Sequence, residues 1–452
     1  MNNRAVDRET YWAPYACIDA RVRRNVRLVV QSGVFSEITC DAERMPSDMA
    51  LTGMVIPGMA DCHSHAFHRA LRGLGKEGRT FWSWRETMYR IAANLTPELY
   101  YRYARAVYTE MLLAGYTTVA EFHYVHHQPD GSPYEDPNIM GKALIRAARE
   151  AGIRLTLLDA CYLHADVKGS PLSERQRRFC DGDADRWRAR VERLERDLTE
   201  DERRTTLIGA AVHSVRACSP QEASVVSQWA SSHGEPRPLH IHLSEQPAEN
   251  QTCVDRYGMS PTELMDTVDF WSGNTVAVHA THLTAKDIEI LSSHGSSVAF
   301  CPTTEADLAD GIGPAGTLFS YGVPLCIGSD ENVSIDPFEE IRQLDAHERL
   351  ATGRRDTFEP ADLLEMMTSN GQKACGWSSS GRLEVGCNAD FVVLGLDFPR
   401  LAGVNPDSAV LVAASDDVSD VFVSGQRVVE NGRHRNGAPS AVIADLTARL
   451  RA

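Results

Sequence analysis

The strongest constraint on the fold is a repeated order in which a short apolar run ends in polar residues and a helix-patterned stretch follows. Such runs occupy residues 54–63, 117–123, 154–160, 207–213, 239–243, 275–279, 297–301 and 324–330. Continuous apolar runs separated by helices are typical of parallel strands that are buried on both faces. Eight of them predict an α/β fold of the closed (β/α)₈ TIM-barrel type.

The connecting stretches and the two ends of the chain follow different patterns. We expect helices over residues 98–114, 139–151 and 187–199, the first two of which stop at Gly115 and Gly152. Residues 10–51 and the chain from 381 onward instead contain short strand-like runs with Gly and Asp turns. These two β segments can meet in one small sheet domain beside the barrel.

Composition limits the partners of the chain. The formal net charge of −16 argues against nucleic acid or an anionic membrane as the main partner, so a small anionic substrate would need a local basic pocket. We expect no membrane helix, because no run approaches ~18 apolar residues, and no secretory signal, because residues 1–13 are polar and charged. The 11 cysteines contain no C-x-x-C pair, which favours a reduced cytoplasm.

Histidines and one aspartate gather at the ends of the predicted strands, where a barrel of this type builds its active site. His63 and His65 have the i, i+2 spacing that puts two side chains on one side of a strand. The combination predicts one divalent metal ion held by His63, His65, His242 and Asp330. Imidazole and carboxylate ligands suit zinc, with iron or manganese as alternatives. We expect His240, which shares the parity of His242, to lie in the core or behind the ligands.

These motifs carry a family resemblance that covers essentially the whole chain. Residues 57–65, 242–245, His279, 328–330 and 381–390 resemble the cytosine/guanine-deaminase type of the amidohydrolase superfamily. The resemblance implies a barrel with a small β-sandwich made from both termini. It divides the chain into residues 1–56 (N-terminal part of the sandwich), 57–378 (hydrolase barrel) and 379–452 (C-terminal part of the sandwich), and it implies a homodimer.

Longer and more unusual segments narrow the resemblance. Residues 81–90, 121–127, 213–216, 240–246, 278–282 and 304–312 are similar to the formimidoylglutamate deiminase family of histidine breakdown. That similarity implies hydrolytic deamination of N-formimino-L-glutamate to N-formyl-L-glutamate and ammonia, by an enzyme that acts on C–N bonds. It also implies a set of residues that bind the glutamate moiety, namely His68, Arg85, Tyr124, His213 and Arg216. Arginine suits this role because its guanidinium binds a carboxylate in a bidentate manner.

The residues make physical sense of such a reaction. A divalent ion lowers the pKa of a bound water from ~15.7 towards ~7–9, which allows hydrolysis near neutral pH. Asp330 can accept the water proton while it binds the ion, and Glu245, three residues beyond His242, can pass a proton to the departing nitrogen. His279 can hold or polarise the attacking water, or assist the proton transfer.

Four residues depart from the pattern of that narrower family and bear on the substrate. His68 stands where Gln is usual, Glu331-Asn332 where Ser-His is expected, and Val212 where Pro is expected. The alternatives are deamination of another formimino or amidine acid, deamination of an aminopurine or pyrimidine, and a catalytically dead barrel that serves as a scaffold. The pair Arg85 and Arg216 favours an acidic substrate, and the complete ligand set argues against a scaffold.

The stretch 163–185 is unusually long and polar for a connection between a strand and a helix. Long loops in compact domains are often functional, so a lid over the active site and a surface insertion are both open interpretations.

Overall fold

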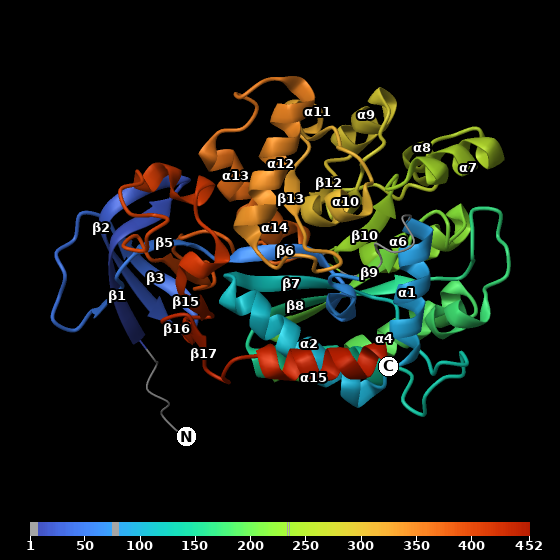
Figure 1. The fold of residues 1–452 in the computed structure, drawn as a ribbon, viewed down its shortest axis with the longest axis horizontal. Coiled ribbons are helices and arrows are strands. Elements are labelled where there is room, and N and C mark those ends of the chain that lie inside the picture. Colours follow the sequence, from blue (N-terminus) through green and yellow to red (C-terminus); the bar gives the residue numbers. More distant parts are fainter. Residues whose placement is uncertain (1–7, 75–80, 233, 235) are drawn as a thin grey trace.

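The computed structural model describes residues 8–74, 81–232, 234 and 236–452. Within these residues, eight parallel strands form one sheet whose neighbours in space are also neighbours in sequence (Figure 1). The strands are β6 (Met59–Ser64), β7 (Tyr116–His123), β8 (Arg154–Cys161), β9 (Thr206–Val212), β10 (Leu239–Leu243), β11 (Thr275–His279), β12 (Ser297–Phe300) and β13 (Leu325–Ile327). They match the eight predicted runs, so the predicted barrel is confirmed.

The barrel closes at the place where the predicted ligands lie. Strands β6 and β13 meet through a single parallel bridge between Ser64 and Asp330. The Asp330 amide donates to the His63 carbonyl (2.8 Å), and the His65 amide donates to the Asp330 carbonyl (3.0 Å). Closure therefore brings the first and last strand ends together.

Helices and short 3-10 turns connect the strands. Those of the barrel are η1 (Ala66–Leu71), α1 (Phe81–Ala93), α2 (Pro97–Leu113), α3 (Ile139–Ala151), η2 (Glu174–Phe179), α4 (Ala184–Asp197), α5 (Glu200–Arg203), α6 (Pro220–Ser231), α7 (Pro247–Tyr257), α8 (Pro261–Asp266), α9 (Ala285–Ser293), α10 (Pro302–Leu308), α11 (Ala315–Ser320), α12 (Pro337–Thr352), α13 (Pro360–Met367) and α14 (Ser369–Ala374). The three predicted helices are α2, α3 and α4. Helix α4 begins three residues earlier than expected because the Asp183 side chain caps it by accepting from the Arg186 amide.

Both ends of the chain form a second sheet, which lies at one end of the barrel in Figure 1. Its strands are β1 (Arg8–Ile18), β2 (Arg21–Gln31), β3 (Val34–Thr39), β4 (Met49–Ala50), β5 (Met54–Pro57), β14 (Phe391–Leu394), β15 (Val418–Val423), β16 (Gln426–Glu430) and β17 (Arg433–His434). Strand β5 lies between β1 and β14, so the two termini share one continuous sheet. The sheet has its own hydrophobic core, in which Tyr11 contacts the rings of Phe391 and Phe422.

The first predicted run, residues 54–63, is divided between the two sheets. It turns at Gly58, where β5 leaves the terminal sheet and the chain enters β6 of the barrel. A Cβ atom at Gly58 would lie 2.3 Å from the Thr117 Oγ1, so any other residue at the crossing would displace the Thr117 side chain. The predicted domain limits stay predictions. The chain passes from the terminal sheet into the barrel at Gly58, close to the predicted limit between residues 56 and 57.

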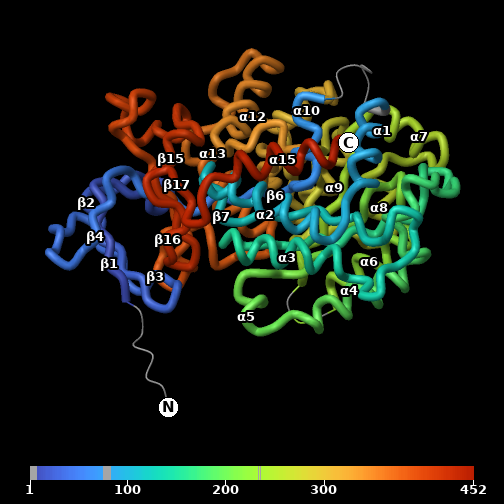
Figure 2. The backbone as a smooth tube through the Cα atoms, turned by 60° about the horizontal axis from the view of Figure 1, so that its bottom comes forward, coloured from blue at the N-terminus to red at the C-terminus, as the bar shows by residue number. Residues whose placement is uncertain are grey.

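The last helix, α15 (Ser440–Arg451), leaves the terminal sheet and lies along the barrel helices (Figure 2). Its Thr447 hydroxyl is 3.0 Å from that of Tyr103 in α2, and Asn94 donates to the Leu450 carbonyl at 3.0 Å. Burial of Ile443, Leu446 and Leu450 explains why this helix returns to the barrel. Short 3-10 turns η3 (Pro406–Leu411) and η4 (Ser415–Asp417) precede β15. Among the described residues, no helix is long and apolar enough to cross a bilayer.

Candidate metal centre and active site

The four predicted ligands converge at the closure of the barrel. Their ligand atoms all lie within 4.8 Å of one another, and all four residues are buried. The Nε2 atoms of His63 and His242 are 3.0 Å apart, and the Asp330 Oδ1 lies 3.4 Å from the Nε2 atoms of both His63 and His65. Donor atoms at this spacing can share one ion, since zinc binds imidazole nitrogen at about 2.1 Å.

Two backbone carbonyls fix the orientation of the ligand imidazoles. The Nδ1 of His65 donates to the Phe122 carbonyl (2.9 Å), and the Nδ1 of His242 donates to the His213 carbonyl (2.8 Å). In this tautomer the Nε2 lone pair of each ring faces the other ligands. Burial lowers the pKa of His65 to about 3 and holds those of His63 and His242 well below the ordinary value. The imidazoles are therefore neutral, which is the form that binds a metal.

This donor set fits a divalent cation. Three neutral imidazoles and one carboxylate match the ligands of catalytic zinc and related metals. A thiol is close by, because Cys301 groups with His279 and Asp330 within 4.8 Å. Burial raises the pKa of Cys301 well above its ordinary value, so the sulfur stays protonated and is a poor ligand.

His279, at the end of β11, lies among three carboxylates. Its Nε2 is 3.6 Å from the Asp330 Oδ2 and 3.9 Å from the Glu245 Oε1, and its Nδ1 is 3.4 Å from the Glu305 Oε1. Burial opposes protonation, but Glu245, Glu305 and Asp330 outweigh it and raise the pKa of His279 to about 10. Glu305 of α10 is a contact that sequence reasoning missed, although it lies inside the characteristic segment 304–312.

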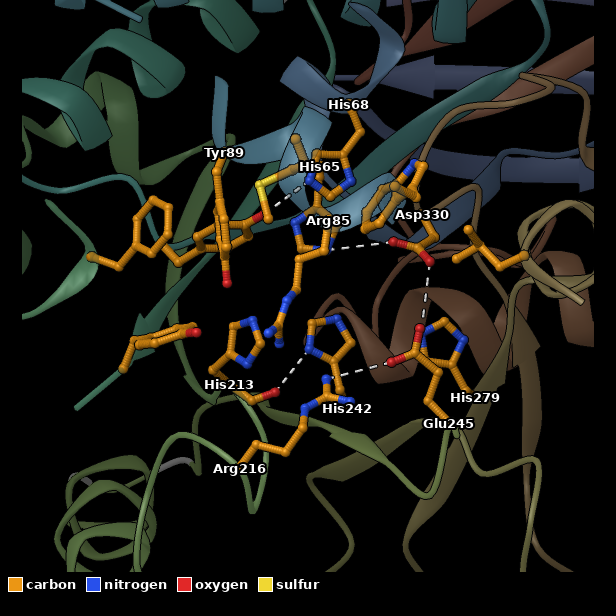
Figure 3. Close-up of a pocket in the computed structure, with 16 residues that line it drawn as sticks. His65, His68, Arg85, Tyr89, His213, Arg216, His242, Glu245, His279 and Asp330 are labelled. Atoms are coloured by element: carbon orange, nitrogen blue, oxygen red, sulfur yellow. Dashed lines mark hydrogen bonds and ion pairs between the residues drawn. The ribbon is translucent and has the colours of Figure 1, made fainter. Parts of the chain in front are cut away.

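One pocket contains most of the predicted site (Figure 3). Its lining includes the predicted catalytic residues Glu245, His279 and Asp330, the ligands His65 and His242, and all the predicted substrate residues, namely His68, Arg85, Tyr124, His213 and Arg216. The His68 Nε2 is 2.8 Å from the Tyr124 hydroxyl. Burial keeps the pKa values of His68 and His213 well below the ordinary value, so both rings are neutral hydrogen-bonding groups.

Six further residues line the pocket wall. They are Trp84, Met88 and Tyr89 of α1, Tyr162 after β8, Phe179 of η2 and Leu308 of α10. Three of them, Trp84, Met88 and Tyr89, belong to the segment 81–90, one of the segments that resemble the narrower family. Tyr162 and Phe179 carry no comparable motif, because only the tertiary fold brings them to the pocket.

The segment 163–185 forms part of this wall. The buried Arg178 of η2 donates to the carbonyls of Ala92, Leu95 (3.1 Å) and His127 (3.0 Å). These bonds tie η2 to the end of α1 and to the loop after β7. Neighbouring Phe179 lines the pocket, so the segment is more than a surface insertion.

Arg216 lies between two carboxylates. Its Nη1 is 3.0 Å from the Glu249 Oε2, and its Nη2 is 3.4 Å from the Glu245 Oε2. Glu249 sits in the first turn of α7, and its other oxygen accepts from the Ser244 amide at 2.8 Å. Sequence reasoning missed Glu249 because it lies outside the characteristic segments.

The positions after Asp330 have clear structural roles. The Asn332 side chain donates to the carbonyls of His65 and Asp330, both at 3.1 Å, and accepts from the Ser329 hydroxyl at 2.9 Å. It thereby braces the turn that presents the ligands. Burial and then Asp330 raise the pKa of Glu331 well above its ordinary value, so this side chain adds little negative charge.

His240 donates to the Ala374 carbonyl (3.1 Å) and is a core residue.

The sequence matches a known protein family and several of its members. The model of the Amidohydrolase family matches residues 54–428. Formimidoylglutamate deiminase from Pseudomonas aeruginosa is 39% identical over 434 residues, which cover 92% of this chain and 94% of the relative. A 5-methylthioadenosine/S-adenosylhomocysteine deaminase from Archaeoglobus fulgidus is 29% identical over 406 residues, 89% of each chain.

Solved structures share the whole fold. The crystal structure of an amidohydrolase from Brucella melitensis has a TM-score of 0.91 at 33% identity and covers 98% of this chain and 100% of that one. An adenosine deaminase from Xanthomonas campestris with bound zinc has a TM-score of 0.82 at 22% identity, with 97% of each chain covered. The second likeness concerns the fold alone.

Proposed function

Because this chain belongs to the amidohydrolase family and is a hydrolytic deiminase that acts on C–N bonds, we propose that its substrate is N-formimino-L-glutamate. The observation that carries the proposal is the meeting of Arg85, Arg216 and the candidate ligands in one pocket of a protein with net charge −16. Arginine binds carboxylates in preference to neutral groups. The 39% identical formimidoylglutamate deiminase supports the same substrate.

We propose zinc as the bound ion, with iron as the alternative. The neutral imidazoles and the Asp330 carboxylate support this choice, as does the zinc in the structural neighbour of the same fold. A divalent ion held by these four residues would supply the Lewis acidity that activates water for hydrolysis.

The reaction adds one water to the formimino carbon and breaks its bond to the terminal nitrogen. N-formyl-L-glutamate and ammonia are the products, and the water supplies both the oxygen and the protons. In the proposed reaction Asp330 accepts a proton from the water, and Glu245 returns one to the departing nitrogen. His279, between these two carboxylates, can hold a proton or donate a hydrogen bond to the reacting group. Arg85, Arg216, His213, Tyr124 and His68 bind the glutamate moiety.

A second candidate is deamination of an aminopurine. The pocket wall has aromatic side chains on which a heterocycle could stack, namely Trp84, Tyr124, Tyr162 and Phe179. The 29% identical 5-methylthioadenosine/S-adenosylhomocysteine deaminase also supports this candidate. A neutral heterocycle offers no carboxylate to the guanidinium groups of Arg85 and Arg216, which line the pocket. We therefore rank this candidate second.

An ammonia-release assay on the zinc-loaded protein tests the proposal. The panel contains N-formimino-L-glutamate, N-formimino-L-aspartate, adenine, guanine and 5-methylthioadenosine. We expect turnover of the glutamate compound with the highest kcat/KM. Turnover of a purine with none of either formimino acid would refute the proposed substrate.

We further propose that the enzyme works in the cytoplasm as a homodimer. All eleven cysteines lie within the described residues and are free thiols, which suits a reducing compartment. The homodimer rests on the family resemblance. Light scattering of the purified protein after size-exclusion chromatography should give about twice the chain mass of 49.9 kDa; a single-chain mass would refute the dimer.

A further inference from the structure

We propose that the carboxylate of the substrate acts as the trigger of proton transfer, because it displaces Glu245 from Arg216. In this mechanism Glu249 is a positioning residue that keeps Arg216 in place while Glu245 leaves. The inference rests on the proposed function, since it requires a formimino acid as substrate.

The starting point is a guanidinium shared by two acidic side chains. Arg216 contacts Glu249 at 3.0 Å and Glu245 at 3.4 Å. The side chains of Arg216, Glu245 and Glu249 are only 12%, 7% and 1% exposed. All three therefore interact with little screening by water.

The two carboxylates are held unequally. Glu249 makes the shorter contact, accepts from the Ser244 amide at 2.8 Å, and lies in the first turn of α7, where the helix dipole favours a negative charge. Glu245 makes the longer contact, and its other oxygen faces the His279 Nε2 at 3.9 Å. When one of the two must move, Glu245 is the side chain that leaves.

Binding of the substrate would force one of these two carboxylates to move. A third carboxylate beside Arg216 would leave one guanidinium among three anions in a buried site, which is electrostatically costly. Movement of Glu245 towards the His279 ring, which lies 3.9 Å from its other oxygen, separates it from the incoming carboxylate. Figure 3 shows Glu245 between Arg216 and His279, so its carboxylate already lies beside the ring towards which it would move.

Displacement of Glu245 by the substrate carboxylate makes catalysis, as well as binding, depend on that carboxylate. The enzyme therefore selects acids in both steps. A substrate without a carboxylate leaves Glu245 paired to Arg216, where it does not serve the departing nitrogen. Such a substrate should therefore lose kcat in addition to affinity.

N-ethylformamidine, which carries the formimino group and no carboxylate, is the probe for this inference. We expect ammonia release from it to be slow and to rise about tenfold, with saturation, when propionate is added as a separate carboxylate. In the Arg216→Met variant propionate should give no acceleration. If propionate fails to accelerate the wild type while the same preparation turns over N-formimino-L-glutamate, the trigger is wrong and the proposed function stands. No turnover of N-formimino-L-glutamate would refute the proposed function instead.

A charge-removing variant provides a second test. Glu249→Gln keeps an oxygen for the Ser244 amide but removes one negative charge from Arg216. Arg216 can then hold Glu245 and the substrate together, so KM and kcat for N-formimino-L-glutamate should both fall, each by about three- to tenfold. Glu263→Gln, at the equivalent first-turn position of α8, is the matched control and should leave both constants unchanged. A raised KM for Glu249→Gln with kcat unchanged would mean that Glu249 only holds Arg216 for substrate binding, and it would overturn the displacement of Glu245.

Discussion

At the scale of single residues, the candidate site depends on how buried side chains are held in one chemical form. The Nδ1 atoms of His65 and His242 are used by backbone carbonyls, which leaves one nitrogen of each ring for the ion. Burial keeps these rings neutral, while the surrounding carboxylates keep His279 charged. Histidines a few ångströms apart therefore have different functions because their neighbours differ.

Asp330 is the candidate ligand whose replacement is most informative. Asp330→Asn keeps the size of the side chain but removes its charge, so we expect weaker metal binding and at least a ~10³-fold loss of kcat. Elemental analysis and the ammonia assay measure both effects. Chelation of the wild type should abolish activity, and added zinc should restore it. A fully loaded and fully active variant would remove Asp330 from the metal centre.

At the scale of secondary-structure elements, the pocket wall is held together by buried hydrogen bonds. Arg178 of η2 joins three backbone carbonyls from α1, from the residues after it and from the loop after β7. Burial lowers the pKa of Arg178 to about 10, so the guanidinium stays charged at neutral pH. Helix α1, which carries Arg85, is thus fixed relative to Tyr124 and Phe179.

Loss of this contact should loosen α1. In Arg178→Met the buried carbonyls of Leu95 and His127 lose the guanidinium donor, while that of Ala92 still accepts from the Leu95 amide. Each group left unsatisfied costs about 1–3 kcal/mol. We expect faster hydrogen exchange over residues 81–95 and a raised KM, with metal content unchanged. Arg177→Met, at the exposed neighbouring position, is the control. Unchanged exchange in Arg178→Met would show that α1 is held by other contacts.

Much of this element structure follows from local sequence patterns. The eight strands and the convergence of the four candidate ligands were predictable, because apolar runs and polar strand ends are local features. The return of α15 to the barrel, the pairing of Glu249 with Arg216, and the arrival of Tyr162 and Phe179 at the pocket were not. Each depends on contacts between segments that only the folded chain brings together.

At the scale of the whole molecule, a buried ion pair joins the barrel to the terminal sheet. Arg154 of β8 contacts Asp390, just before β14, at 2.6 Å and also donates to the Ser424 hydroxyl at 2.6 Å. Arg154 and Asp390 are almost completely buried. The barrel floor and the small domain are therefore linked by charge as well as by the chain crossing at Gly58.

Breaking this pair should weaken the whole fold. Arg154→Met leaves Asp390 buried without its cation, which typically costs about 3–5 kcal/mol. Urea unfolding should show a lower free energy of unfolding, with kinetic constants retained by the folded fraction. Arg204→Met removes an exposed arginine nearby and should be nearly neutral. Equal stability of the two variants would exclude a structural role for the ion pair.

Product identification in ¹⁸O-labelled water tests the central claim most directly. The zinc-loaded protein is incubated with N-formimino-L-glutamate, and the products are analysed by mass spectrometry. The proposed reaction predicts N-formyl-L-glutamate that carries one ¹⁸O atom in its formyl group, together with one equivalent of ammonia. Formation of glutamate and formamide, or recovery of unchanged substrate, would contradict the proposed deiminase reaction.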